Sequence, residues 1–141
     1  MCLEKANLVQ QTDDIVCYKV LKGWKYDDIL YSPYRDSEYV VGKKKKLKRT
    51  QPELFRTDKG NLTVGGGAYH SFITKEQAKK WCKIMSDSDF NTWHSGYLVV
   101  ECIIPKTAKY VYKGIFGDGT RKENGYASSE IKPIKVVYQS I

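Results

Sequence analysis

The chain has 141 residues, of which 41% are hydrophobic and 13% aromatic, and its formal net charge at pH 7 is +8. This composition excludes a disordered chain, and the length suits one domain with a single core. No segment approaches the roughly 20 apolar residues of a membrane-spanning helix, and the first residues lack the features of a secretion signal. We therefore expect one cytoplasmic domain covering residues 1–141, with no membrane partner.

Apolar and β-branched runs predict six strands, at residues 15–21, 29–32, 39–41, 97–104, 109–116 and 131–138. Glycine or proline marks the end of several of them. Gly23 and Gly42 follow the first and third strands, Pro33 and Pro105 stop the second and fourth, and Pro133 interrupts the last. Gly117, Asp118 and Gly119 are expected to form a turn after the fifth.

Residues 43–61 lack periodicity, and we expect a long basic loop there, with one helical turn at residues 52–55. Two interpretations of its lysine-rich start remain open. Six like charges repel one another and favour an extended, solvated segment, but they can also bind phosphate or nucleic acid by releasing counterions. The residues concerned are Lys43, Lys44, Lys45, Lys46, Lys48 and Arg49.

One helix is predicted at about residues 75–86. Thr74 and Gln77 have the spacing of a capping box at its start. Ala78, Trp81, Cys82 and Met85 then recur at i, i+3, i+4 and i+7, the pattern of a helix face that packs on a core. The order of strands, one helix and further strands predicts an α+β domain, rich in strand, with mixed or antiparallel sheets.

Lys19 and Glu101 are each the single charge in a strand that otherwise reads as buried. A buried charge must be paired or must open into a cleft. We expect the two residues to lie on central strands and either to pair with each other or to face the same cleft.

The segment around Gly65, Gly66 and Gly67 is the strongest candidate for a ligand pocket. Three glycines cost conformational entropy, which suggests a backbone that a ligand approaches closely. Tyr69, His70 and Phe72 follow and are expected to form the pocket wall. A titrating imidazole at His70 could donate to a ligand or act as acid or base, and the alternative is a hydrogen-bonded structural histidine.

Metal and covalent chemistry have weaker support. The four cysteines form no Cys-x-x-Cys pair and the two histidines no His-x-x-x-His pair, so we expect neither a metal site nor a disulfide framework. His94, in a polar loop, is a weaker candidate than His70. Cys2 could act as an N-terminal nucleophile after removal of Met1, the alternative being a frayed terminus.

From Gly65 onward the chain resembles the second half of the ADP-ribosyltransferase fold, in its poly-ADP-ribose-polymerase-like branch. Residues 65–82 and 98–104 carry the resemblance. It implies NAD as cofactor, a Tyr69 ring that stacks on nicotinamide, and a late catalytic glutamate at Glu123 or Glu130. Tyr18 and Lys19 occupy the early strand, where the family has histidine or arginine, and lysine lacks the planar donor geometry of those side chains.

Four blocks, Tyr-Lys-Val-Leu, Ser-Pro-Tyr, Tyr-His-Ser-Phe and Tyr-Ala-Ser-Ser, also resemble a group of small bacterial and phage proteins that have no assigned function. Our first hypothesis is a small cytosolic, phage-encoded binding protein for a nucleotide or nucleotide-derived ligand. Its site would comprise Tyr69, His70, Phe72, Lys19, Tyr18, Gly66 and Gly67. The second hypothesis is an ADP-ribosyl transferase or hydrolase acting on NAD. The third is a protein-interaction module that uses exposed tyrosine and tryptophan.

Overall fold

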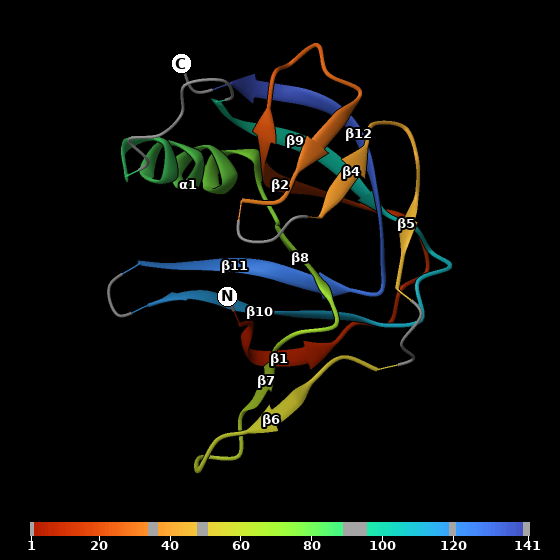
Figure 1. Cartoon of the computed structure of the whole chain (residues 1–141). Helices are drawn as coiled ribbons and strands as arrows, with labels where there is room; N and C mark the ends of the chain where they lie inside the picture. The colour runs from red at the N-terminus through yellow and green to blue at the C-terminus, as the bar shows by residue number, and fades with distance from the viewer. Residues whose placement is uncertain (1, 34–36, 48–50, 89–95, 119–120, 140–141) are drawn as a thin grey trace.

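Figure 1 shows the computed structural model of the chain, which describes residues 2–33, 37–47, 51–88, 96–118 and 121–139. Of the described residues, 55% lie in strands and 11% in one helix. The helix is α1 (Lys75–Ser88). The strands are β1 (Glu4–Leu8), β2 (Ile15–Gly23), β3 (Ile29–Tyr31), β4 (Glu38–Val40), β5 (Lys45–Lys46), β6 (Leu54–Arg56), β7 (Leu62–Val64), β8 (Tyr69–Phe72), β9 (Gly96–Ile104), β10 (Val111–Asp118), β11 (Arg121–Ser128) and β12 (Glu130–Gln139).

The fold is mainly β, so the expected α+β class is wrong. All six expected strands are present, as β2, β3, β4, β9, β10 and β12. The expected loop at 43–61 contains β5 and β6, and residues 52–55 form no helical turn. β1, β7, β8 and β11 are further strands. β1, β7 and β8 are short, and β11 is mostly polar with a glycine in its middle, so all four depend on their partners across the sheet and their own residues carry little periodicity.

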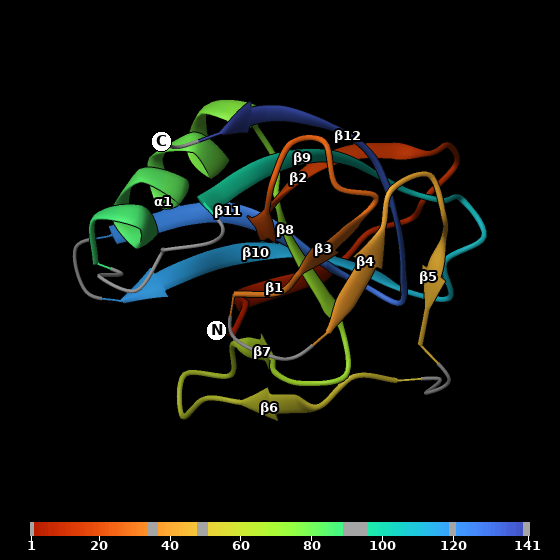
Figure 2. The ribbon, with the colours of Figure 1, turned by 45° about the horizontal axis from the view of Figure 1, so that its top comes forward.

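Ten of the strands form one antiparallel sheet that curls into a half-barrel (Figures 1 and 2). Its main order is β1-β10-β11-β8-β2-β9-β12-β5, and the β3–β4 hairpin extends from β2. β6 and β7 form a separate two-stranded hairpin. Pro133 lies in β12, where the pairing with β9 is irregular, as expected for a residue without a ladder donor.

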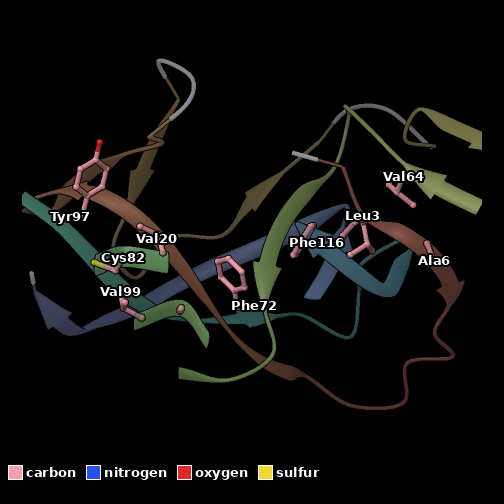
Figure 3. Close-up of a cluster of buried hydrophobic side chains, with 11 residues drawn as sticks. Leu3, Ala6, Val20, Val64, Phe72, Cys82, Tyr97, Val99 and Phe116 are labelled. Atoms are coloured by element: carbon pink, nitrogen blue, oxygen red, sulfur yellow. The ribbon is translucent and has the colours of Figure 1, made fainter. Parts of the chain in front are cut away.

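Two buried clusters occupy opposite faces of the central strands. The helix-side core contains the residues of β2 and β9 that face α1, and Figure 3 shows Val20, Val99 and Phe72 among its members. The hairpin-side core lies under β3, β4 and β5. Its members are Cys17, Leu21, Leu30, Tyr39, Tyr69, Leu98, Val100, Cys102, Ile104, Val111 and Ile131.

The register of β2 and β9 separates the two charges that were expected to pair. Both strands are central and adjacent, as predicted, but Lys19 lies opposite Val100 while Glu101 lies opposite Tyr18. Because directly paired residues share a face and successive residues alternate, Lys19 and Glu101 point to opposite faces. The expected pairing is therefore wrong. Glu101 instead lies 3.9 Å from the ammonium group of Lys135.

The helix begins where the sequence predicts. The backbone N–H of Gln77 donates to Thr74 Oγ1 at 3.2 Å, and the backbone N–H of Thr74 donates to Gln77 Oε1 at 3.1 Å. This reciprocal pair confirms the capping box. Ala78 and Cys82 are fully buried, and Trp81 and Met85 are partly buried against the same core.

We expect Thr74→Ala to lower the free energy of unfolding by about 1 kcal/mol, because it leaves a backbone N–H of the first turn without its side-chain acceptor. Urea denaturation measures the change. Thr74→Ser keeps the hydroxyl and is the matched control. Equal stability of the alanine and serine variants would show that the cap contributes nothing.

No helix among the described residues is long and apolar enough to cross a membrane. Two expectations fall partly outside those residues. Most of the polar loop before β9, with His94, and Gly119 of the expected turn after β10 belong to this undescribed part.

Candidate functional site

A pocket opens where β2 and β8 separate. The two strands are paired at a single position, Tyr18 opposite Phe72. Away from that position lies a pocket of about 370 Å³, a size typical of small-molecule sites. β2, β8, α1, the β3–β4 hairpin and β5 all contribute to it. The lining residues are Cys2, Lys19, Val20, Ser32, Pro33, Ser37, Tyr39, Lys45, Leu47, Gly65, Gly66, Gly67, Ala68, Tyr69, His70, Ser71, Phe72, Trp81, Met85 and Phe116.

Two lysines converge on the ring of Tyr39 at one end of the pocket. The ammonium of Lys45 lies 4.2 Å from the Tyr39 centroid, and that of Lys19 lies 5.3 Å from it. Lys19 also donates to the backbone carbonyl of His70 at 2.5 Å, a carbonyl on the stretch of β8 that has left β2. Lys45 donates to Ser37 Oγ and, at 2.7 Å, to the carbonyl of Glu38. We call Lys19, Lys45 and Tyr39 the cationic end.

No carboxylate balances this charge within the described wall of the pocket. Three described carboxylates, those of Glu130, Glu123 and Glu101, form ion pairs away from the cationic end, with Lys44, Lys80 and Lys135 respectively. Electron-rich tyrosine faces offset part of the repulsion between two ammonium groups. The remaining positive potential favours an anion.

The positive charge of the cationic end also affects the pKa of His70. Burial, and next the charge of Lys19, lowers the pKa of His70 to about 4, although contacts with the backbone at Val64 and Ala68 oppose the shift. Its Nε2 atom is buried and has no hydrogen-bond partner among the described residues. A pKa lowered this far keeps the ring uncharged down to well below neutral pH, so it does not support the expected acid or base near pH 7.

Tyr69 lines the pocket but is mostly a core residue. It is only 7% exposed, and its ring meets that of Tyr39 edge-on, with centroids 6.3 Å apart and planes at 70°. Burial, and next the neighbouring Tyr39, raises the pKa of Tyr69, so the phenol stays protonated. Its ring therefore supports the cationic end more than it offers a free stacking face.

The part of the pocket wall that belongs to the helix-side core is aromatic and apolar, and we call its residues Phe72, Trp81 and Phe116 the aromatic end. Phe72 and Trp81 stack with centroids 6.3 Å apart and planes at 22°, and Phe116 meets Phe72 edge-on at 5.8 Å. Trp81 is only partly buried, unlike Phe72 and Phe116. The sequence predicts Trp81 on the helix face that packs on the core. It does pack there, but it also offers a ring to the pocket, and helical periodicity cannot distinguish the two roles.

Close packing or backbone conformation accounts for Gly65 and Gly67. A Cβ atom at Gly65 would lie 3.0 Å from the Phe55 ring, and one at Gly66 would lie 3.2 Å from the Glu53 carboxylate. Gly67 has φ near +79°, and its carbonyl accepts a hydrogen bond from Tyr110 Oη. Gly66 and Gly67 do line the pocket, but the positive φ of Gly67 needs no ligand, and the atoms nearest a Cβ at Gly66 are the end of the flexible Glu53 side chain.

The described lysines of residues 43–46 differ in whether their side chains reach the pocket. Lys45 enters the pocket, whereas Lys43, Lys44 and Lys46 do not line it. The Lys44 ammonium lies 3.3 Å from the carboxylate of Glu130. Lys48 and Arg49 lie outside the described residues.

The two candidate catalytic glutamates are not among the pocket residues. Glu130 is 2% exposed and accepts a hydrogen bond from Thr107 Oγ1 at 2.7 Å in addition to its ion pair with Lys44. Glu123 pairs with Lys80 at 3.0 Å. Tyr18, a third predicted site residue, packs against the helix-side core instead of lining the pocket.

Cys2 and Tyr39 were not included among the predicted ligand-binding residues. The backbone of Leu3 pairs with that of Val64 through two hydrogen bonds, of 2.9 and 2.8 Å, and this places Cys2 at the pocket. Tyr39 reaches it from β4. No local pattern predicts that either residue lines this pocket, because long-range strand pairing brings both to it.

Searches of protein-family models, of curated proteins and of solved structures found no match to this chain. Within the described ranges, no group of three or more His, Cys, Asp or Glu side chains could hold a metal ion.

Proposed function

We propose that this protein is a cytoplasmic, phage-encoded binding protein whose pocket takes a nucleotide or a nucleotide-derived ligand. The observation that carries the proposal is the cationic end, where two ammonium groups lie 4.2 and 5.3 Å from the centroid of the Tyr39 ring with no carboxylate in the described wall. Two like charges brought close together in a partly buried site repel each other. An anionic group such as phosphate relieves that repulsion and accepts their remaining N–H donors.

The aromatic end suits the rest of such a ligand. Aromatic rings stack on any base, and each such contact contributes on the order of 1–3 kcal/mol. The partly buried Trp81, supported by Phe72, offers such a face. A ligand with an anionic group at one end and a planar ring at the other therefore matches both ends of the pocket.

Calorimetric titration with AMP, ADP, ADP-ribose, NAD, adenosine and inorganic phosphate tests the proposal. We expect the phosphorylated nucleotides to bind more tightly than adenosine or phosphate alone, because only they engage both ends. Lys19→Met and Lys45→Met should each weaken nucleotide binding by roughly tenfold or more, since a hydrogen bond to a charged group is worth about 1.5–3 kcal/mol.

Lys22→Met is the matched control. Lys22 lies on the same strand as Lys19, and its ammonium lies 5.4 Å from the Tyr97 ring, but it does not line the pocket. We expect nucleotide affinity to be unchanged in this variant. Equal losses in the Lys19 and Lys22 variants, or no heat with any nucleotide, would contradict the proposal, and the second result would favour a protein-interaction module.

NAD belongs in the panel because the resemblance to ADP-ribosyltransferases implies it. Binding without turnover supports the proposed function. Release of nicotinamide would instead make the protein an ADP-ribosyl transferase or hydrolase, and its acidic group would then have to come from outside the described wall of the pocket.

A further inference from the structure

β5 forms one rim of the pocket, and its side chains alternate across that rim. Lys45 and Leu47 line the pocket, whereas Lys46, between them, is exposed and pairs across the sheet with Glu130. Lys43 is exposed as well, and the Lys44 side chain is 43% exposed despite its ion pair. We call Lys43, Lys44 and Lys46 the outer rim. Positive charge thus continues from Lys45, inside the pocket, to the exposed lysines next to it in the chain.

The outer rim has a charge that a single bound nucleotide would not use. Exposed lysines in a row repel each other, and polyphosphate backbones are the partners that such rows attract most strongly, through counterion release. Lys44 and Lys46 are alternate residues, and in an extended chain such residues are about 6.7 Å apart, comparable to the separation of successive phosphates in an extended single strand. The pocket itself, at about 370 Å³, is near the small end of ligand sites and has room for one nucleotide.

We propose that the partner of this site is a single-stranded nucleic acid, one nucleotide of which enters the pocket while its neighbouring phosphates bind the outer rim. This inference rests on the proposed function, because Lys45 serves the nucleotide in the pocket and the outer rim serves the flanking chain. A duplex presents stacked and paired bases, so it offers no nucleotide to the pocket without unpairing.

Fluorescence anisotropy with labelled single strands of about 12 nucleotides, one DNA and one RNA of the same sequence, tests the proposal on the full chain. The decisive variant is Lys43→Ser/Lys46→Ser, which retains Lys44 and so keeps a partner for the buried Glu130. We expect it to bind the single strands at least tenfold more weakly at 50 mM salt. The slope of log affinity against log salt concentration should become shallower by about 1.4, the value for two lost phosphate contacts.

Lys75→Ser/Lys83→Ser is the matched control, because it removes two exposed lysines from α1, away from the outer rim. It should change neither the affinity nor the slope. Mononucleotide affinity should be the same in the Lys43/Lys46 variant as in the unmodified protein. Lys45→Met should weaken both oligonucleotide and mononucleotide binding.

The outcomes separate the two proposals. Mononucleotide binding that depends on Lys19 and Lys45, without tighter binding of either single strand, would overturn the present inference and leave the proposed function intact. Oligonucleotide binding that is indifferent to Lys45→Met would also overturn the inference, because no nucleotide of the strand would then use the pocket, whereas loss of mononucleotide binding to the unmodified protein would overturn the proposed function. Equal affinity for a duplex, for heparin and for the single strands would show a nonspecific polyanion surface and would also overturn the inference. A difference between the DNA and RNA strands would identify the natural class.

Discussion

Gly125→Ala should lower the free energy of unfolding by at least about 3 kcal/mol, more than overpacking usually costs. Gly125 lies on β11, opposite Phe72 of β8. A Cβ atom there would lie 1.9 Å from Cε2 of Phe116 and 2.6 Å from the backbone oxygen of Ser71. Neither neighbour can move easily, because Phe116 is 1% exposed and the oxygen belongs to the paired strand.

This glycine also bears on the site, since it makes room for the Phe116 ring beside His70 and Phe72, with centroids at 5.4 and 5.8 Å. Urea denaturation measures the change. Gly66→Ala is the matched control and should cost less than about 1 kcal/mol, because its nearest neighbour is the end of the flexible Glu53 side chain. A change within about 0.5 kcal/mol at Gly125 would show that β8 and β11 are not packed in this way.

The second large effect concerns pH. The pKa of His70 is lowered from 6.5 to about 4 in the folded protein, so between these values the unfolded chain binds more protons than the folded chain. The contribution of His70 to stability is therefore complete above about pH 6.5. It is lost as the pH falls toward 4, and the full loss amounts to about 3 kcal/mol.

We expect His70→Asn to flatten the pH dependence of the unfolding free energy between pH 6.5 and 4, relative to the unmodified protein. Aspartate and glutamate titrate in both proteins and cancel in the comparison. An NMR titration of the imidazole checks the same point directly. In Lys19→Met the midpoint should rise, because one cause of the shift is removed. A midpoint near 6.5 in the folded, unmodified protein would contradict the assignment.

Local sequence patterns predicted what depends on local interactions. Thr74 and Gln77 are three residues apart and cap the helix without help from the rest of the chain. The apolar runs of β2 and β9 identify central strands wherever their partners lie. Lys19 stood out because a charge in a buried strand needs an explanation, and it does reach the pocket.

The glycine turn led to the correct region, but for a reason that the structure replaces. Its proximity to Tyr69 and His70 in sequence ensured that these residues would share one site. Contacts with Glu53 and Phe55, twelve and ten residues before Gly65, explain the missing Cβ atom there instead. No local pattern reveals that β6 lies against this turn.

The sequence by itself determined the helix, the central strands and the neighbourhood of the pocket, because each depends on periodicity or on residues close together in the chain. Tertiary structure decided that Lys19 and Glu101 face apart, that Lys45 rather than Lys44 enters the pocket, and that His70 is uncharged. A shift of one residue in strand register exchanges the faces of every side chain, and a pKa depends on burial and on charges from other strands. Such features depend on pairings between distant segments, which is why only the folded chain revealed them.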